Sequence, residues 1–108
     1  MSQTPLEATT TRTDAGATIA LSGDIDGGAR EALDAAYAEV GGGDAVLLDF
    51  SRVDYINSTG IALIVGVLAR ARAQERPVSA RGLTEHYREI FRITRLSDFM
   101  EIVEGDAA

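Results

Sequence analysis

Residues 53–60 read Val-Asp-Tyr-Ile-Asn-Ser-Thr-Gly, and this mostly polar stretch joins two strongly apolar segments. The run before it, residues 45–50, is Ala-Val-Leu-Leu-Asp-Phe and predicts a strand. The run after it, residues 61–68, is Ile-Ala-Leu-Ile-Val-Gly-Val-Leu and predicts a helix that begins near Ser58. The stretch therefore forms an elbow that places hydroxyl side chains at a helix start, where the backbone dipole is positive.

Upstream of the elbow, the pattern predicts a hairpin over residues 6–22, with a half-buried strand at residues 17–21. Residues 23–26 (Gly-Asp-Ile-Asp) read as a loop in which Asp26 caps the next helix. That helix is amphipathic and ends at the glycines of residues 41–43. Its apolar face consists of Ala29, Ala32, Leu33, Ala36, Tyr37 and Val40.

The run at residues 45–50 is apolar enough to predict a central strand covered on both faces. Downstream we expect a helix over 58–74, a strand over 77–81, a third helix capped by Thr84, and a last strand over 99–103. The apolar stripe of the third helix includes Tyr87, Ile90 and Phe91. The order β-β-α-β-α-β-α-β predicts an α/β domain with a mixed, mostly parallel sheet, an N-terminal hairpin and helices packed against the sheet. We expect residues 1–108 to form one domain, with a core at about 5–104 and short frayed ends.

Composition excludes several functions. The formal charge is −7, from 17 acidic and 10 basic residues, which argues against binding to nucleic acid or to an anionic membrane. The chain has no cysteine and one histidine, so we expect no disulfide, no metal site and no cofactor. No signal peptide is visible in residues 1–11, and the longest apolar run is about half a membrane span. These features favour a cytoplasmic protein.

The hydroxyl groups of the elbow have two interpretations. In the first, Ser58 or Thr59 caps the helix, a task that Asn57 can also perform, and Gly60 allows close packing against the preceding strand. In the second, Ser58 accepts a phosphate, whose charge is tolerated at a helix N-terminus and is felt by a docked partner. The elbow by itself does not decide between them.

The elbow resembles that of the STAS domain family, in particular the anti-sigma factor antagonists of the SpoIIAA and RsbV type. In that family an Asp-Ser-Ser/Thr-Gly segment follows an apolar strand, and residues 57–60 read Asn-Ser-Thr-Gly. A second family signature, Gly-Glu-Leu-Asp, matches residues 23–26. The resemblance covers about residues 5–104, and the order of elements agrees.

The resemblance implies a phosphorylation switch without catalysis by this chain. The phosphorylated serine of the family corresponds to Ser58, with Thr59 as a less favoured acceptor. Unphosphorylated, the chain would bind an anti-sigma factor that is also a serine kinase, and so release a sigma factor. Phosphorylation would end that binding, and a separate phosphatase would reset the protein. The alternative is a STAS subunit with a structural or regulatory role in an ABC-type lipid transporter or a stressosome-like scaffold.

Asn57 departs from the family pattern, which has Asp before the serine. The amide keeps the shape and capping ability of Asp but lacks its charge. Loss of that charge makes an added phosphate easier to tolerate, and it also removes a group that a kinase can recognise. Asn57 therefore leaves phosphorylation less certain than an Asp would.

Four further residues are candidates for partner contact around the elbow. The expected core face of the second helix consists of Ile61, Ile64, Val65 and Leu68. Leu63 and Val67 lie off that face, so they form a docking patch beside Ser58, are buried by a neighbouring helix, or are isolated exposed apolar residues. Asp24 and Asp26 either serve the loop and cap alone or contact the partner and repel a phosphate on Ser58. We expect Asp24, Asp26, Asn57, Ser58, Thr59, Gly60, Leu63 and Val67 to bind the partner.

Enzymatic hydrolysis is not expected. No Gly-x-Ser-x-Gly motif surrounds Ser58, and nothing in the sequence places His86 beside it. The glycines at residues 41–43 follow a helix and therefore do not form a phosphate-binding loop.

Overall fold

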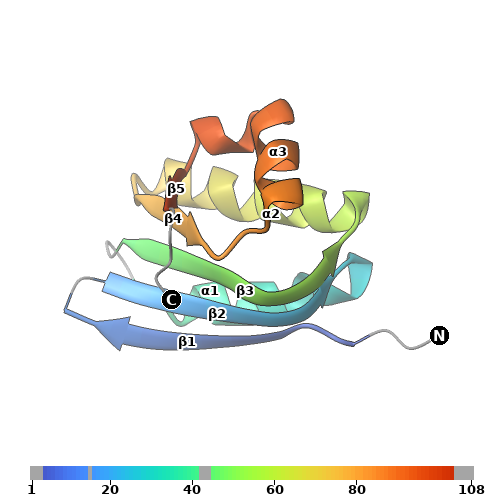
Figure 1. Cartoon of the computed structure of the whole chain (residues 1–108). Coiled ribbons are helices and arrows are strands. Elements are labelled where there is room, and N and C mark those ends of the chain that lie inside the picture. Colours follow the sequence, from blue (N-terminus) through green and yellow to red (C-terminus); the bar gives the residue numbers. More distant parts are fainter. Residues whose placement is uncertain (1–3, 15, 42–44, 104–108) are drawn as a thin grey trace.

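Five strands form one sheet in the order β1-β2-β3-β4-β5 (Figure 1). The computed structural model describes residues 4–14, 16–41 and 45–103. The strands are β1 (Glu7–Thr13), β2 (Gly16–Ile25), β3 (Val46–Ile56), β4 (Val78–Arg81) and β5 (Glu101–Val103). The α-helices are α1 (Arg30–Ala38), α2 (Ser58–Ala73) and α3 (Glu85–Ile93), with short 3-10 helices η1 (Gly27–Ala29) and η2 (Leu96–Asp98).

The topology confirms the expected fold class. β1 pairs with β2 antiparallel, and β2, β3, β4 and β5 are parallel neighbours. The helices interleave with the strands in the predicted order. The predicted turn at residue 15, the glycines at 42 and 43 and the frayed terminal residues 1–3 and 104–108 lie outside the described residues.

The hydrophobic core lies on one face of the sheet. Buried residues alternate with more exposed ones along β2, β4 and the first half of β3, as expected for a sheet with one solvated face. The core-facing set is Ala17, Ile19, Leu21, Val46, Leu48, Phe50, Val78 and Ala80. The first helix presents its predicted apolar face to this core, with Ala32 partly buried.

The prediction that residues 45–50 are covered on both faces was wrong. Leu47 and Asp49 point to the opposite side from Leu48 and are only half-buried. Leu47 is flanked within the sheet by Thr18 and Ser79, so neighbouring side chains shelter it without a covering helix. The apolar run contains too few polar residues to reveal which face meets water.

Two strands run further than the sequence predicted. β2 continues through the signature at residues 23–25, and β3 continues through the elbow as far as Ile56. The two extensions pair with each other, with Gly23 opposite Val53 and Ile25 opposite Ile56. The expected loop at residues 23–26 is therefore a strand end, and only Asp26 lies outside it.

Candidate functional site

The elbow begins where β3 ends at Ile56, and Asn57 is the residue that caps α2. The Asn57 side-chain oxygen accepts a hydrogen bond from the Gly60 backbone N–H at 2.8 Å. The Asn57 carbonyl accepts another from the Ile61 N–H at 2.9 Å. The cap therefore belongs to Asn57, and neither Ser58 nor Thr59 is needed for it.

Ser58 and Thr59 are the first two residues of α2, and both are exposed. Within the described residues, the side-chain hydroxyl groups of Ser58 and Thr59 have no hydrogen-bond partner. The backbone N–H groups of these two residues have none either. Free N–H groups in a first helical turn favour an anion, as does the helix dipole. The Ser58 hydroxyl is thus accessible, unoccupied and located where added negative charge is tolerated.

Gly60 joins the two sequence signatures. A Cβ atom at this position would lie 1.9 Å from the carbonyl oxygen of Ile25, so only glycine fits. The same carbonyl accepts a hydrogen bond from the Asn57 N–H at 3.2 Å. The close packing of Gly60 is against β2, not against the preceding strand as the sequence had suggested.

The signature at residues 23–26 has a structural task at each polar position. Gly23 has a φ of +106°, and a Cβ there would lie 2.6 Å from the Pro5 carbonyl oxygen. Asp24 exchanges hydrogen bonds with Thr4, through its backbone N–H at 3.0 Å and its carboxylate at 3.3 Å. Asp26 caps η1 by accepting from the Gly28 N–H at 3.0 Å.

The loop after β2 lies beside the elbow. A Cβ added to Gly27 would lie 3.6 Å from the Thr59 methyl carbon. The structure therefore brings the loop after β2, at Gly27, next to the start of α2. Asp24 and Asp26 are half-buried, so each keeps a partly accessible carboxylate.

The exposed face of α2 differs from the one that the sequence predicted. Val67 is 5% exposed and belongs to the core, and Leu63 is half-buried against it. Val65, which was expected in the core, is 45% exposed. The docking patch predicted at Leu63 and Val67 is thus wrong for Val67, which is buried as the alternative interpretation had it.

The exposed face of α2 forms an apolar stripe that starts at the phosphate-acceptor candidate. Ser58, Ala62, Val65 and Ala69 are exposed and fall at i, i+4, i+7 and i+11 on the same side of α2. The stripe leads to a groove of about 250 Å³ that Val65, Ala69, Arg72 and Phe99 help to line. We call the set of Ser58, Ala62, Val65 and Ala69 the α2 stripe.

Tyr87 lies on α3, and its hydroxyl group reaches the elbow. The sequence predicted only that its ring belongs to the apolar face of α3. The hydroxyl oxygen accepts a hydrogen bond from the Ile56 N–H at 2.9 Å and donates to the Ile56 carbonyl at 3.5 Å. The exposed His86 ring packs edge-on against the Tyr87 ring, with centroids 4.9 Å apart. The only sequence signal for this role was a tyrosine in place of a purely apolar residue on a core-facing stripe.

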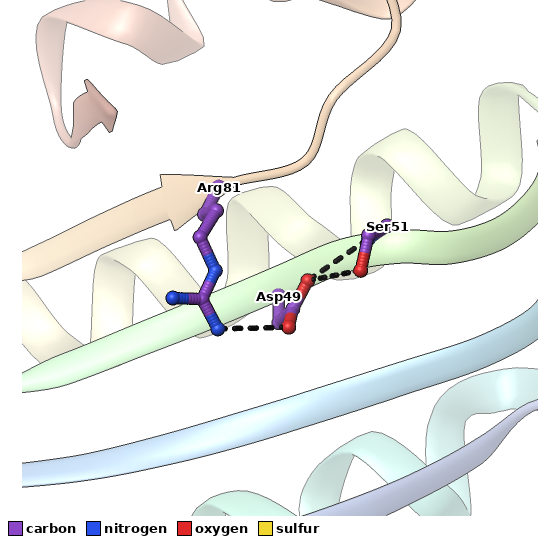
Figure 2. Close-up of polar contacts among 3 residues, drawn as sticks. All are labelled: Asp49, Ser51 and Arg81. Carbon is purple, nitrogen blue, oxygen red and sulfur yellow. Dashed lines mark hydrogen bonds and ion pairs between the residues drawn. The ribbon is translucent and has the colours of Figure 1, made fainter. Parts of the chain in front are cut away.

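A second polar cluster lies on the solvated face of the sheet. The Asp49 carboxylate accepts hydrogen bonds from the Ser51 N–H at 3.0 Å, the Ser51 hydroxyl at 2.7 Å and the Arg81 guanidinium at 2.9 Å (Figure 2). Partial burial raises the pKa of Asp49, but the hydrogen bonds from Ser51 and Arg81 outweigh it and hold the pKa below its ordinary value. Asp49 thus accepts three hydrogen bonds within the fold, and the cluster joins β3 to β4, so its role is structural.

Residues 4–14, 16–41 and 45–103 hold no group of three or more metal-ligating side chains. No helix among these residues is long and apolar enough to cross a membrane.

Known proteins resemble this chain over most of its length. Residues 8–104 match the family model described as Mlab, STAS domain. The anti-sigma-B factor antagonist of Listeria monocytogenes is 33% identical over 94 residues, which cover 82% of this chain and 81% of that protein. The anti-sigma-B factor antagonist of Staphylococcus aureus strain NCTC 8325 is 30% identical over 60 residues, which cover 56% of each chain.

Solved structures show the same fold. An anti-sigma factor antagonist from Mycobacterium paratuberculosis has a TM-score of 0.73 at 21% identity, covering 97% of this chain and 92% of that one. Unphosphorylated SpoIIAA has a TM-score of 0.69 at 18% identity, covering 95% and 89%. Phosphorylated SpoIIAA from Bacillus has a TM-score of 0.67 at 18% identity, covering 94% and 93%.

Proposed function

The chain belongs to the STAS domain family, and from this membership we propose that it is an anti-sigma factor antagonist switched by phosphorylation of Ser58. In its unphosphorylated form it binds an anti-sigma factor that is also a serine kinase. That binding releases a sigma factor. The curated relatives described above are antagonists, so a role in lipid transport or in a scaffold is not favoured.

The observation that carries the proposal is that one residue of the elbow caps the helix and another remains available for modification. Asn57 caps α2, which leaves the exposed Ser58 hydroxyl without a structural task. A hydroxyl with no partner in the fold can be modified without breaking a native hydrogen bond. The fold also tolerates the product, because the phosphate lies at the positive end of α2.

In the transfer step, the Ser58 hydroxyl oxygen forms a bond to the γ-phosphorus of ATP held by the kinase. The bond between that phosphorus and the β,γ-bridging oxygen breaks, ADP leaves, and the hydroxyl proton passes to a base of the kinase or to water. This chain supplies the acceptor and the docking surface and acts as substrate, not as catalyst. A phosphatase hydrolyses the phosphoserine and restores the binding form.

The α2 stripe supports a docking surface next to the acceptor. Ala62, Val65 and Ala69 are small or medium apolar side chains on the exposed side of the helix, and they follow Ser58 along the same face. A partner packed on this face would exclude water from the region beside Ser58. A doubly charged phosphate at the end of the stripe would then have to be desolvated, and the nearby carboxylate of Asp26 adds repulsion.

The test is to incubate the purified chain with ATP and each serine-kinase anti-sigma factor of the source genome, then locate phosphate by mass spectrometry. Phosphate on Ser58, its loss in Ser58→Ala and its persistence in Thr59→Ala are the expected results. Binding to the same kinase should survive in Ser58→Ala and fall at least about tenfold in Ser58→Asp. Failure of every such kinase to modify or bind the chain would overturn the proposal.

A further inference from the structure

The two neighbours of β3 stop at different points along it. β2 accompanies β3 to its end, where Ile25 is opposite Ile56. β4 pairs only with residues 46–49 and ends at Arg81. The distal part of β3, residues 50–56, therefore continues toward the elbow, and no strand among the described residues pairs with its β4 side.

The backbone of Ile56 faces that unpaired side. The next residue, Asn57, directs its N–H to the Ile25 carbonyl of β2. Because successive peptide groups of a strand point in opposite directions, the N–H and carbonyl of Ile56 point away from β2. Ile56 is 5% exposed, so little water is available to satisfy these two groups.

The Tyr87 hydroxyl occupies the place of the missing strand. It accepts from the Ile56 N–H and donates to the Ile56 carbonyl, so one hydroxyl serves both groups. Its ring is held in place by the packing of α3, because Phe91 is fully buried and meets the Phe50 ring edge-on at 5.8 Å. The Thr84 hydroxyl, which accepts from the Tyr87 N–H at 3.2 Å, fixes the start of the same helix.

We propose that Tyr87 is a positioning residue for phosphorylation: by holding the Ile56 peptide, it keeps Ser58 in the backbone geometry that the kinase recognises. The inference rests on the proposed function of Ser58. Ile56 precedes Ser58 by two positions. Asn57, between them, donates a hydrogen bond to the Ile25 carbonyl and accepts one from the Gly60 N–H. The elbow is thus braced from β2 on one side and from α3 on the other. If either set of hydrogen bonds is lost, Ser58 at the first position of α2 can shift relative to the rest of the helix, on which the kinase docks.

The variant Tyr87→Phe tests this inference because it removes the hydroxyl and keeps the ring. In hydrogen exchange measured by NMR, we expect the Ile56 amide to exchange at least about tenfold faster, while the amide of Leu48 in the core of β3 is unchanged. With the kinase that modifies the wild type, kcat/KM for phosphorylation should fall about tenfold.

Two controls separate positioning from general stability. Tyr55→Phe removes a hydroxyl from a ring that is 53% exposed and should behave as wild type in both measurements. Leu33→Ala removes a buried side chain of α1, which lowers the stability of the domain and leaves α3 and the Tyr87 hydroxyl unchanged in sequence. Assayed well below its unfolding temperature, Leu33→Ala should retain most of its phosphorylation rate.

The outcomes distinguish the inference from the function beneath it. If the wild type is phosphorylated on Ser58 and Tyr87→Phe matches it in kcat/KM, the positioning role is overturned and the switch stands. A loss of rate in Leu33→Ala as large as that in Tyr87→Phe also overturns it. If no kinase modifies the wild type, the proposed function fails, and the positioning role fails with it.

Discussion

Gly60 of α2 lies directly against the carbonyl oxygen of Ile25 in β2, and a Cβ at position 60 would lie 1.9 Å from that oxygen. Ile25 itself is fully buried, so neither backbone can retreat without disturbing the core. The two family signatures are therefore halves of one contact. The first supplies the carbonyl, and the second supplies the residue without a side chain that fits over it.

Gly60→Ala should destabilise the domain by about 2 kcal/mol or more, because the obstruction is backbone and not a movable side chain. Urea unfolding followed by circular dichroism measures the change. Gly66→Ala is the matched control, since it lies in the same helix and its added Cβ meets nothing within 4 Å. It should stabilise the domain by up to about 1 kcal/mol through helix propensity. Equal effects at the two positions would contradict the contact.

The same contact explains what sequence patterning missed in α2. Apolar residues occur on nearly every side of this helix, so periodicity alone could not select its core face. In the structure the buried residues are Gly60, Ile64, Val67, Leu68 and Ala71, at i, i+4, i+7, i+8 and i+11 from the pinned glycine. Had Gly60 been taken as the start of the core face, Val67 would have been placed inside and Val65 outside.

The elements with one clear apolar face were predictable. The apolar face of the first helix, the strand β4 and the cap at Thr84 are as the sequence indicated. Asp26 differs, because it caps the 3-10 helix η1 and α1 begins only at Arg30. The length of β3 was not predictable, because Ser51, Arg52 and Asp54 read as a loop when taken alone. Their strand conformation depends on pairing with the end of β2 and on the hydroxyl of Tyr87, both of which are distant in sequence.

Substitutions at Asn57 separate capping from kinase recognition. Asn57→Ala should lower the free energy of unfolding by about 1 kcal/mol, because the Gly60 N–H loses its acceptor. Asn57→Asp restores the usual family residue, keeps the acceptor and places a negative charge at the helix start, so stability should be equal or up to about 1 kcal/mol higher.

Both variants can be measured by thermal unfolding and by the phosphorylation rate of Ser58. If the kinase recognises a negative charge before the serine, the Asn57→Asp variant is phosphorylated faster than the wild type. If the charge only repels the phosphate, this variant is phosphorylated more slowly. Unchanged stability in Asn57→Ala would contradict the assignment of Asn57 as the cap.

Asp49 makes part of the stability depend on pH. Its pKa in the folded protein is below the ordinary value, so its contribution is present at neutral pH and is lost as the pH falls through the folded pKa. The ion pair with Arg81 is partly solvated, with side-chain exposures of 19% for Asp49 and 40% for Arg81. We therefore expect Asp49→Asn to cost only about 1 kcal/mol at pH 7.

Urea unfolding of wild type and Asp49→Asn at pH 7 and near pH 3 measures this dependence. The difference between the two proteins should shrink at the lower pH, because the carboxylate takes up a proton in the unfolded chain before it does so in the folded protein. Asp34→Asn is a suitable control, because Asp34 pairs with Arg70 at an exposed site and should contribute less at either pH. A difference that grows on acidification would reverse the assigned direction of the pKa.

Charge substitutions along α2 test where the partner docks. Val65→Glu places a carboxylate in the middle of the α2 stripe, on a side chain that is already 45% exposed. Stability should change by less than about 0.5 kcal/mol, while binding to the kinase should weaken at least about tenfold, since the charge must be desolvated in the complex. Ala73→Glu, near the end of the same helix and also exposed, is the control and should leave binding unchanged.

Val67→Glu should behave in the opposite way, because Val67 is 5% exposed and the carboxylate would enter the core. We expect this variant to unfold or to lose several kcal/mol, so that any loss of binding follows from loss of fold. Leu63→Glu should fall between the two, since Leu63 is half-buried against the core. Circular dichroism and calorimetric titration with the kinase distinguish these cases. Folded Val67→Glu that cannot bind, together with fully active Val65→Glu, would return the docking surface to the face first expected from the sequence.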